Sequence, residues 1–183
     1  MRNALLALLF LLCGACARFE NPIEAESGAA LDPALIGRWF AEGPDGRFEM
    51  EIVRNGNECR IVATSTEKGE APILEELRLI TARLERQTFA SVTGSGSGAG
   101  GNWTLLRYEL ATPDRLVIFL DDGRAWDDAV RNKQIPGVAD EAGRVRNSRV
   151  TASSEELRVF ILGYGSVIFG DQPNGEFKRL PAN

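Results

Sequence analysis

The side chains that most often carry chemistry in proteins are scarce in this chain of 183 residues, which has no histidine. That removes the commonest general base, the commonest metal ligand and the middle member of serine and cysteine triads. Cys13 and Cys16 belong to the N-terminal segment, so Cys59 is alone in the rest of the chain. Without a histidine to activate it, Cys59 is better explained as a small hydrophobe on a strand. We expect no thiol chemistry, no disulfide and no cofactor.

Two pairs of carboxylates, Asp121-Asp122 and Asp127-Asp128, flank the segment 123–126. Oxygen-rich loops can hold calcium, but the alternating spacing of a calcium loop is absent and Arg124 lies in the middle. A strand end followed by the acidic first turn of a helix explains these residues better. The sequence therefore predicts no metal site.

The elements that must position any site follow a period of two. Phe48, Met50 and Ile52 alternate with polar residues, and Asn55-Gly56 then predicts a hairpin to a strand over 59–65. Further strands are expected at 37–40, 89–93, 103–110, 116–120, 166–169 and 176–180. Many short strands at even spacing predict a mainly β protein built as a single antiparallel barrel.

One stretch and two helices complete the expected elements. Residues 72–86 fit either an amphipathic helix or a strand, and we choose a strand over 77–85 because the strand over 89–93 needs a hairpin partner. One short helix is expected over 127–133. A second is expected over 154–162, where Ser153 and Glu156 form a capping box and Gly163 can end the helix.

The strand over 103–110 has two faces, and the choice between them decides the chemistry of the interior. If Leu106, Tyr108 and Leu110 point inward, Tyr108 is the polar handle of an apolar interior. If the other face points inward, Arg107 and Glu109 form a buried pair that can anchor a charged ligand. We favour the first arrangement because an apolar core is less costly.

The N-terminus is typical of an export signal. Arg2 is followed by an uninterrupted apolar run over 4–12, which is too short to be a permanent membrane span. Gly14-Ala15-Cys16 resembles a bacterial lipobox, so we favour cleavage after residue 15 and lipidation of Cys16. Cleavage after Ala17 is the alternative. This divides the chain into a signal peptide at 1–15, a lipid-anchored tether at 16–31 and a barrel domain at 32–183.

Gly37-Arg38-Trp39 resembles the Gly-x-Trp signature that opens lipocalin-like barrels, and Arg179 lies where that superfamily places an arginine. The segment 149–158, with Ile168-Phe169 and the segment 177–180, also resembles uncharacterised bacterial lipocalin-like exported proteins. The resemblance implies that Arg179 packs on Trp39 and closes one end of the barrel. We expect the guanidinium within about 6 Å of the indole.

Residues 94–101 are small without exception. A phosphate loop would need a following lysine and a helix, so this segment is better interpreted as a flexible hairpin loop at the mouth of the barrel.

The expected function is that of a cell-envelope lipoprotein, anchored in the membrane of a bacterium and facing the periplasm, that binds a small apolar or amphipathic ligand. The candidate cavity residues are Phe48, Met50, Ile52, Leu106, Tyr108 and Leu110. Their bulk favours a narrow or filled barrel, so a structural or protein-interaction module is the alternative. A hydrolase or isomerase without histidine is less favoured, and the net charge of −5 gives no reason to bind nucleic acid.

Overall fold

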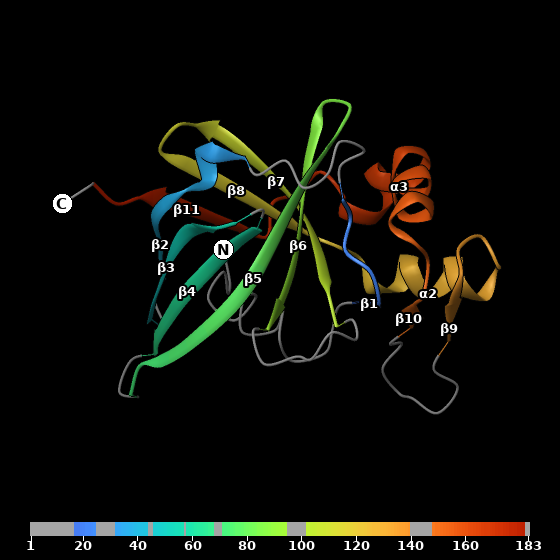
Figure 1. The fold of residues 1–183 in the computed structure, drawn as a ribbon, viewed down its shortest axis with the longest axis horizontal. Coiled ribbons are helices and arrows are strands. Elements are labelled where there is room, and N and C mark those ends of the chain that lie inside the picture. Colours follow the sequence, from blue (N-terminus) through green and yellow to red (C-terminus); the bar gives the residue numbers. More distant parts are fainter. Residues whose placement is uncertain are drawn as a thin grey trace.

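The barrel is the main feature of the computed structural model (Figure 1). Eight antiparallel strands close on themselves in the order β11-β2-β3-β4-β5-β6-β7-β8. The expected mainly β fold, with a single antiparallel barrel and short helices, is confirmed. The structure describes residues 17–24, 32–43, 46–56, 58–67, 71–94, 102–139 and 148–181.

Each barrel strand alternates between inward and outward side chains. The strands are β2 (Gly37–Gly43), β3 (Gly46–Asn55), β4 (Glu58–Glu67), β5 (Ile73–Leu84), β6 (Gln87–Gly94), β7 (Thr104–Thr112), β8 (Arg115–Leu120) and β11 (Gly175–Arg179). The ambiguous stretch is therefore a strand, as predicted. This strand is apolar on both faces because both are buried. Leu77 and Leu79 point into the barrel, while Ile80, Ala82 and Leu84 lie in a second core outside it.

The predicted turn at Asn55-Gly56 joins two of the expected strands. Gly56 takes a φ of +63° between β3 and β4, a backbone region that favours glycine. Pro113 and Asp114 make the tight joint between β7 and β8. The last strand, β11, closes the barrel by pairing with β2, where Arg179 lies opposite Trp39, and with β8.

Two α-helices, α2 (Gly123–Arg131) and α3 (Ser154–Phe169), lie on one side of the barrel (Figure 1). The helix expected over 127–133 begins earlier because the Asp122 side chain accepts a hydrogen bond from the Arg124 backbone at 2.9 Å and caps it. The predicted capping box of Ser153 and Glu156 is present and begins α3.

The strand expected over 166–169 is wrong, because these residues are the last turn of α3. The helix continues past Gly163 because its last turn buries Ile168 and Phe169 under the barrel wall. The Phe169 ring lies 5.3 Å from the ring of Phe89, centroid to centroid. Packing of this turn outweighs the β propensity of its sequence.

The tether expected at 16–31 also differs from the structure. Residues 17–24 pack on the domain, with Phe19 and Ile23 almost completely buried. Strand β1 (Arg18–Phe19) pairs with β10 (Arg149–Val150), which pairs with β9 (Gly137–Val138). The signal peptide, Cys16 and residues 25–31 fall outside the described residues.

Apolar side chains form two cores, one on each face of the barrel wall. The inner core fills part of the barrel and includes Trp39, Met50, Ile61, Leu77, Leu106 and Tyr108. The outer core lies between β5–β8, the two helices and residues 17–23, and includes Phe19, Phe89, Leu105, Trp126, Leu157 and Phe160. Helix α3 buries Leu157, Phe160 and Ile161 in this outer core. No helix in the described part of the chain is long and apolar enough to cross a membrane.

Candidate functional site: an apolar cavity in the barrel

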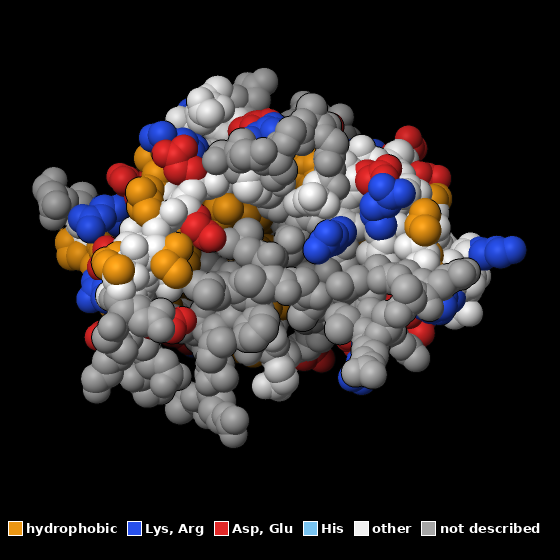
Figure 2. All heavy atoms as spheres, turned by 90° about the horizontal axis from the view of Figure 1, so that it is seen from below, with side chains coloured by type: hydrophobic (Ala, Val, Ile, Leu, Met, Phe, Trp, Pro, Cys, Tyr) orange, Lys and Arg blue, Asp and Glu red, His pale blue; other side chains and the backbone are white. Residues whose placement is uncertain are grey.

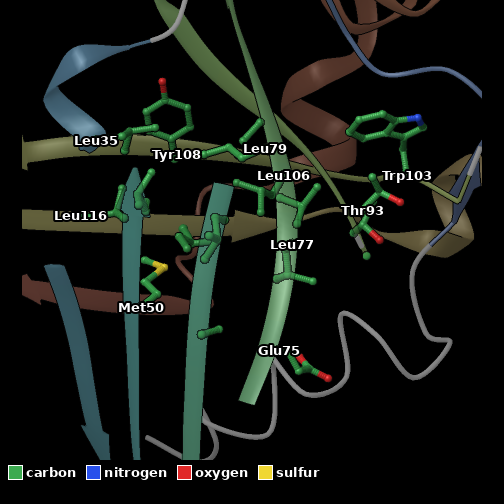
Figure 3. Close-up of a pocket in the computed structure, with 18 of the residues that line it drawn as sticks. Leu35, Met50, Glu75, Leu77, Leu79, Thr93, Trp103, Leu106, Tyr108 and Leu116 are labelled. Atoms are coloured by element: carbon green, nitrogen blue, oxygen red, sulfur yellow. The ribbon is translucent and has the colours of Figure 1, made fainter. Parts of the chain in front are cut away.

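The inner core surrounds a cavity of about 300 Å³ (Figure 3). Most of its walls are aliphatic side chains from β3, β4, β5, β7 and β8. Apolar cavities of about 150 Å³ can already bind benzene or xenon, and ligand pockets begin at about 300 Å³. The cavity is thus large enough for a small organic molecule or part of a lipid.

Small inward residues explain why the barrel is not full. Ala63 on β4 and Ala90 on β6 line the cavity at positions where a larger side chain would enter it. The sequence-based expectation of a filled or narrow barrel rested on the bulk of β3, β7 and β8 alone. The inward alanines of β4 and β6 are the signal that it missed.

The candidate cavity residues fall in two groups. Five of them, Phe48, Met50, Ile52, Leu106 and Tyr108, line the cavity. Leu110 is half-buried against the inner core and lies outside the lining. The strand β7 therefore turns the Tyr108 face inward.

One end of the barrel is closed by a short 3-10 helix, η1 (Pro33–Leu35), and by Arg179. The indole of Trp39 donates to the Leu35 carbonyl at 2.8 Å. The Arg179 guanidinium lies 4.1 Å from the centroid of the Trp39 ring, within the expected 6 Å. It also donates to the carbonyls of Ile36 at 2.8 Å and Pro113 at 2.9 Å, and to that of Ala34. These bonds join η1 to the β7–β8 turn.

Tyr108 is a polar side chain of the cavity lining at this closed end. Its hydroxyl donates to the Asp32 carboxylate at 3.0 Å, and the Asp32 backbone N–H donates to the Thr81 hydroxyl at 3.2 Å. Burial of the phenol, with the nearby Asp32 carboxylate, raises the pKa of Tyr108 well above its ordinary value. The phenol points toward η1 in Figure 3, so its hydroxyl helps to hold η1 over the closed end of the barrel.

The other end of the cavity is more polar. There the lining includes Arg18 of β1, Glu75 of β5, and Thr93, Asn102 and Trp103 near the β6–β7 connection. We call this set the mouth. The expected loop at 94–101 begins here, because Gly94 and Asn102 line the cavity, while 95–101 lie outside the described residues. Sequence reasoning missed these residues because only barrel closure brings them together.

One carboxylate of each acidic pair that flanks 123–126 serves a structural role. Asp122 caps α2, and the buried Asp127 carboxylate accepts from Ser148 Oγ at 2.6 Å and from Arg131 Nε at 2.8 Å. Within the described residues, no group of three or more Cys, Asp or Glu side chains could hold a metal ion.

The alternative charged anchor lies outside the barrel. Arg107 is on the outer face of β7, where its guanidinium carbon lies 3.6 Å from the Phe119 ring centroid. It donates to the Gly170 carbonyl at 3.1 Å and to the Glu109 carboxylate. It ties the end of α3 to the barrel wall and does not reach the cavity.

Cys59 is buried in the inner core. Its burial raises the pKa of the thiol to about 11. A thiol with so high a pKa holds almost no thiolate near neutral pH and is a poor nucleophile.

Comparison of the chain with protein-family models, with curated proteins and with solved structures finds no match.

Proposed function

We propose that this protein is a lipid-anchored protein of the bacterial cell envelope whose barrel binds a small apolar or amphipathic molecule. The observation that carries the proposal is the cavity of about 300 Å³, apolar along its walls and polar at one end. An aliphatic chain entering such a cavity gains about 0.8 kcal/mol for each buried methylene. A polar head group can stay at the mouth, beside Arg18 and Glu75.

The envelope location is proposed from the N-terminal sequence. Gly14-Ala15-Cys16 directly follows the apolar run, which is the order that a lipoprotein signal requires. Cleavage before Cys16 removes Arg2 as the only charged side chain and takes the formal charge from −5 to −6. Mass spectrometry of the mature N-terminus tests this part: an unmodified chain that starts at Arg18 contradicts it.

Two other functions are less well supported. A purely structural envelope module would be more stable with a filled barrel, because an empty cavity of this size lowers stability. A hydrolase or isomerase would need polar groups that converge in the cavity. Its polar lining is instead divided between Tyr108, engaged with Asp32 at the closed end, and the mouth.

A titration with a fluorescent polyene fatty acid tests ligand binding. We expect saturable binding to the wild type and at least tenfold weaker binding to Ala90→Leu, because the substitution adds three carbons that enter the cavity. Val62→Leu is the matched control: Val62 is on the outward face of β4, beside the inward Ala63, and the substitution adds one carbon outside the barrel. Equal binding by all three proteins, or none by the wild type, contradicts the proposal.

A further inference from the structure

We propose that the mouth of the cavity rests on a lipid bilayer and that the ligand passes directly between bilayer and barrel. The inference builds on the proposed function, since it takes Cys16 to carry the lipid. It adds an orientation and a source for the ligand, which come from three features of the structure.

The first feature is the place where the described chain begins. Cys16 lies two residues before Arg18, and two residues of backbone span at most about 7 Å. Arg18 is a mouth residue. Its backbone is fixed there, because the Arg18 N–H donates to Ser148 at 3.3 Å and the Phe19 N–H donates to Trp103 at 3.0 Å. A lipid on Cys16 is therefore attached beside the mouth and cannot move to the other end of the barrel.

The second feature is an apolar rim at the same end. Ile73 and Leu74, at the beginning of β5, are 46% and 67% exposed and directly precede the mouth residue Glu75. Figure 2 views the molecule from this side and shows hydrophobic side chains at the surface of its barrel half. Side chains of this kind gain free energy when they enter the acyl region of a bilayer.

The third feature is charge. The mature chain is acidic, so a negatively charged membrane surface gives it no electrostatic attraction. Contact must come from the acyl anchor and the apolar rim, and we expect it on neutral phosphatidylcholine vesicles. A mouth held at such a surface takes up an apolar ligand without exposing it to water, which removes the main cost of transfer.

The orientation is tested with the lipidated mature protein in phosphatidylcholine vesicles. Leu74→Cys and Val159→Cys are each labelled with a polarity-sensitive fluorophore, and buried Cys59 stays unlabelled. Val159 is the matched control because it is also 67% exposed but lies on α3, away from the beginning of β5 (Figure 1). Quenching by spin-labelled lipid reports contact with the bilayer, and quenching by iodide reports contact with water.

We expect the label at 74 to be quenched by the lipid at least threefold more than the label at 159. Equal quenching, or stronger quenching at 159, overturns the orientation, and so does an unmodified Cys16. The quenching result is separate from the test of ligand binding. A protein that binds the polyene probe but keeps residue 74 in water loses only the orientation. One that inserts residue 74 but takes up no probe loses only the binding function.

A kinetic experiment tests the passage of ligand. The variant Ile73→Ser/Leu74→Ser is expected to take up the polyene probe from vesicles several-fold more slowly than the wild type, with equal occupancy at equilibrium. Val159→Ser/Leu162→Ser removes a similar apolar surface from α3 and is expected to leave the rate unchanged. An unchanged rate in the first variant, or an equal slowing in both, contradicts direct exchange with the bilayer.

Discussion

Strands β5 to β8 bury side chains on both faces, and the two faces are packed in different ways. On the outer face Phe19 meets Trp126 edge to face at 4.8 Å between ring centroids, and Phe160 lies 5.3 Å from the same indole. On the inner face Ala90 of β6, with Ala63 of β4, borders an unfilled volume of about 300 Å³. One wall thus separates a close-packed core from a hollow one.

This contrast assigns stability to the outer core and ligand binding to the barrel interior. A hollow interior gives up dispersion contacts and hydrophobic burial, which weakens a domain of this size. The helices and the segment 17–24 add a second core on the outside of the wall. We infer that this outer core stabilises the wall enough for the interior to remain open.

The largest expected effect follows from removing the centre of the outer core. Trp126 is fully buried, and Trp126→Ala should lower the free energy of unfolding by about 3–5 kcal/mol, measured by denaturant titration. Trp126→Phe should cost much less, because it keeps an aromatic ring and removes an indole N–H that has no hydrogen-bond acceptor among the described residues. A loss below about 1 kcal/mol for Trp126→Ala would show that the outer core is not the main source of stability.

The next effect concerns the closed end. Arg179→Ala removes the contact with Trp39 and the hydrogen bonds to three backbone carbonyls, so the free energy of unfolding should fall by about 2–3 kcal/mol. Arg179→Lys keeps the charge but not the planar fork, and should lie between the wild type and Arg179→Ala. Two variants as stable as the wild type would mean that Arg179 does not close the barrel.

A pair of identical substitutions compares the two cores directly. Ala152 is fully buried in the outer core, so Ala152→Leu should overpack it and cost about 1–3 kcal/mol of unfolding free energy. Ala90→Leu places the same group in the cavity and should change stability by less than about 1 kcal/mol. Equal destabilisation by both substitutions would remove the distinction between a filled and a hollow core.

The smallest effect is the pH dependence due to Cys59. The pKa of this thiol is about 11 in the folded protein and 9.0 in its ordinary state. Above pH 9 the unfolded chain therefore releases this proton before the folded chain does, so stability falls as the pH rises. Between pH 8 and pH 10 the free energy of unfolding of the wild type should fall by about 1 kcal/mol more than that of Cys59→Ala. Cys59→Ala itself should cost about 1 kcal/mol at pH 7. If the unfolding free energies of the two proteins changed in parallel with pH, the raised pKa of Cys59 would be contradicted.

Much of the barrel could be predicted from the sequence because its signals are local. Asn55-Gly56 specifies a turn within a few residues, and Ser153 with Glu156 specifies a helix start. The end of that helix could not be predicted, because burial of Ile168 and Phe169 depends on a barrel wall that is distant in sequence. Local patterns determine where elements begin, and long-range packing determines how far they extend.

For the candidate site, only the apolar residues of the cavity wall could be predicted from the sequence. Alternation along β3 and β7 is enough to place Met50 and Tyr108 inside. The mouth combines Arg18, Glu75 and Asn102 from three separate segments, and no spacing in the sequence brings them together. The packing of residues 17–24 was missed because Ala17 and Phe19 alternate over too short a run to indicate a strand.

Xenon binding tests the central claim, a hollow inner core beside a filled outer one, most directly. Xenon enters dry apolar cavities and needs no polar partner. A crystal structure under xenon pressure should show xenon inside the barrel, among Met50, Leu77 and Leu106, and none beside Trp126. Xenon beside Trp126, or a barrel interior without xenon and filled by side chains, would contradict the account.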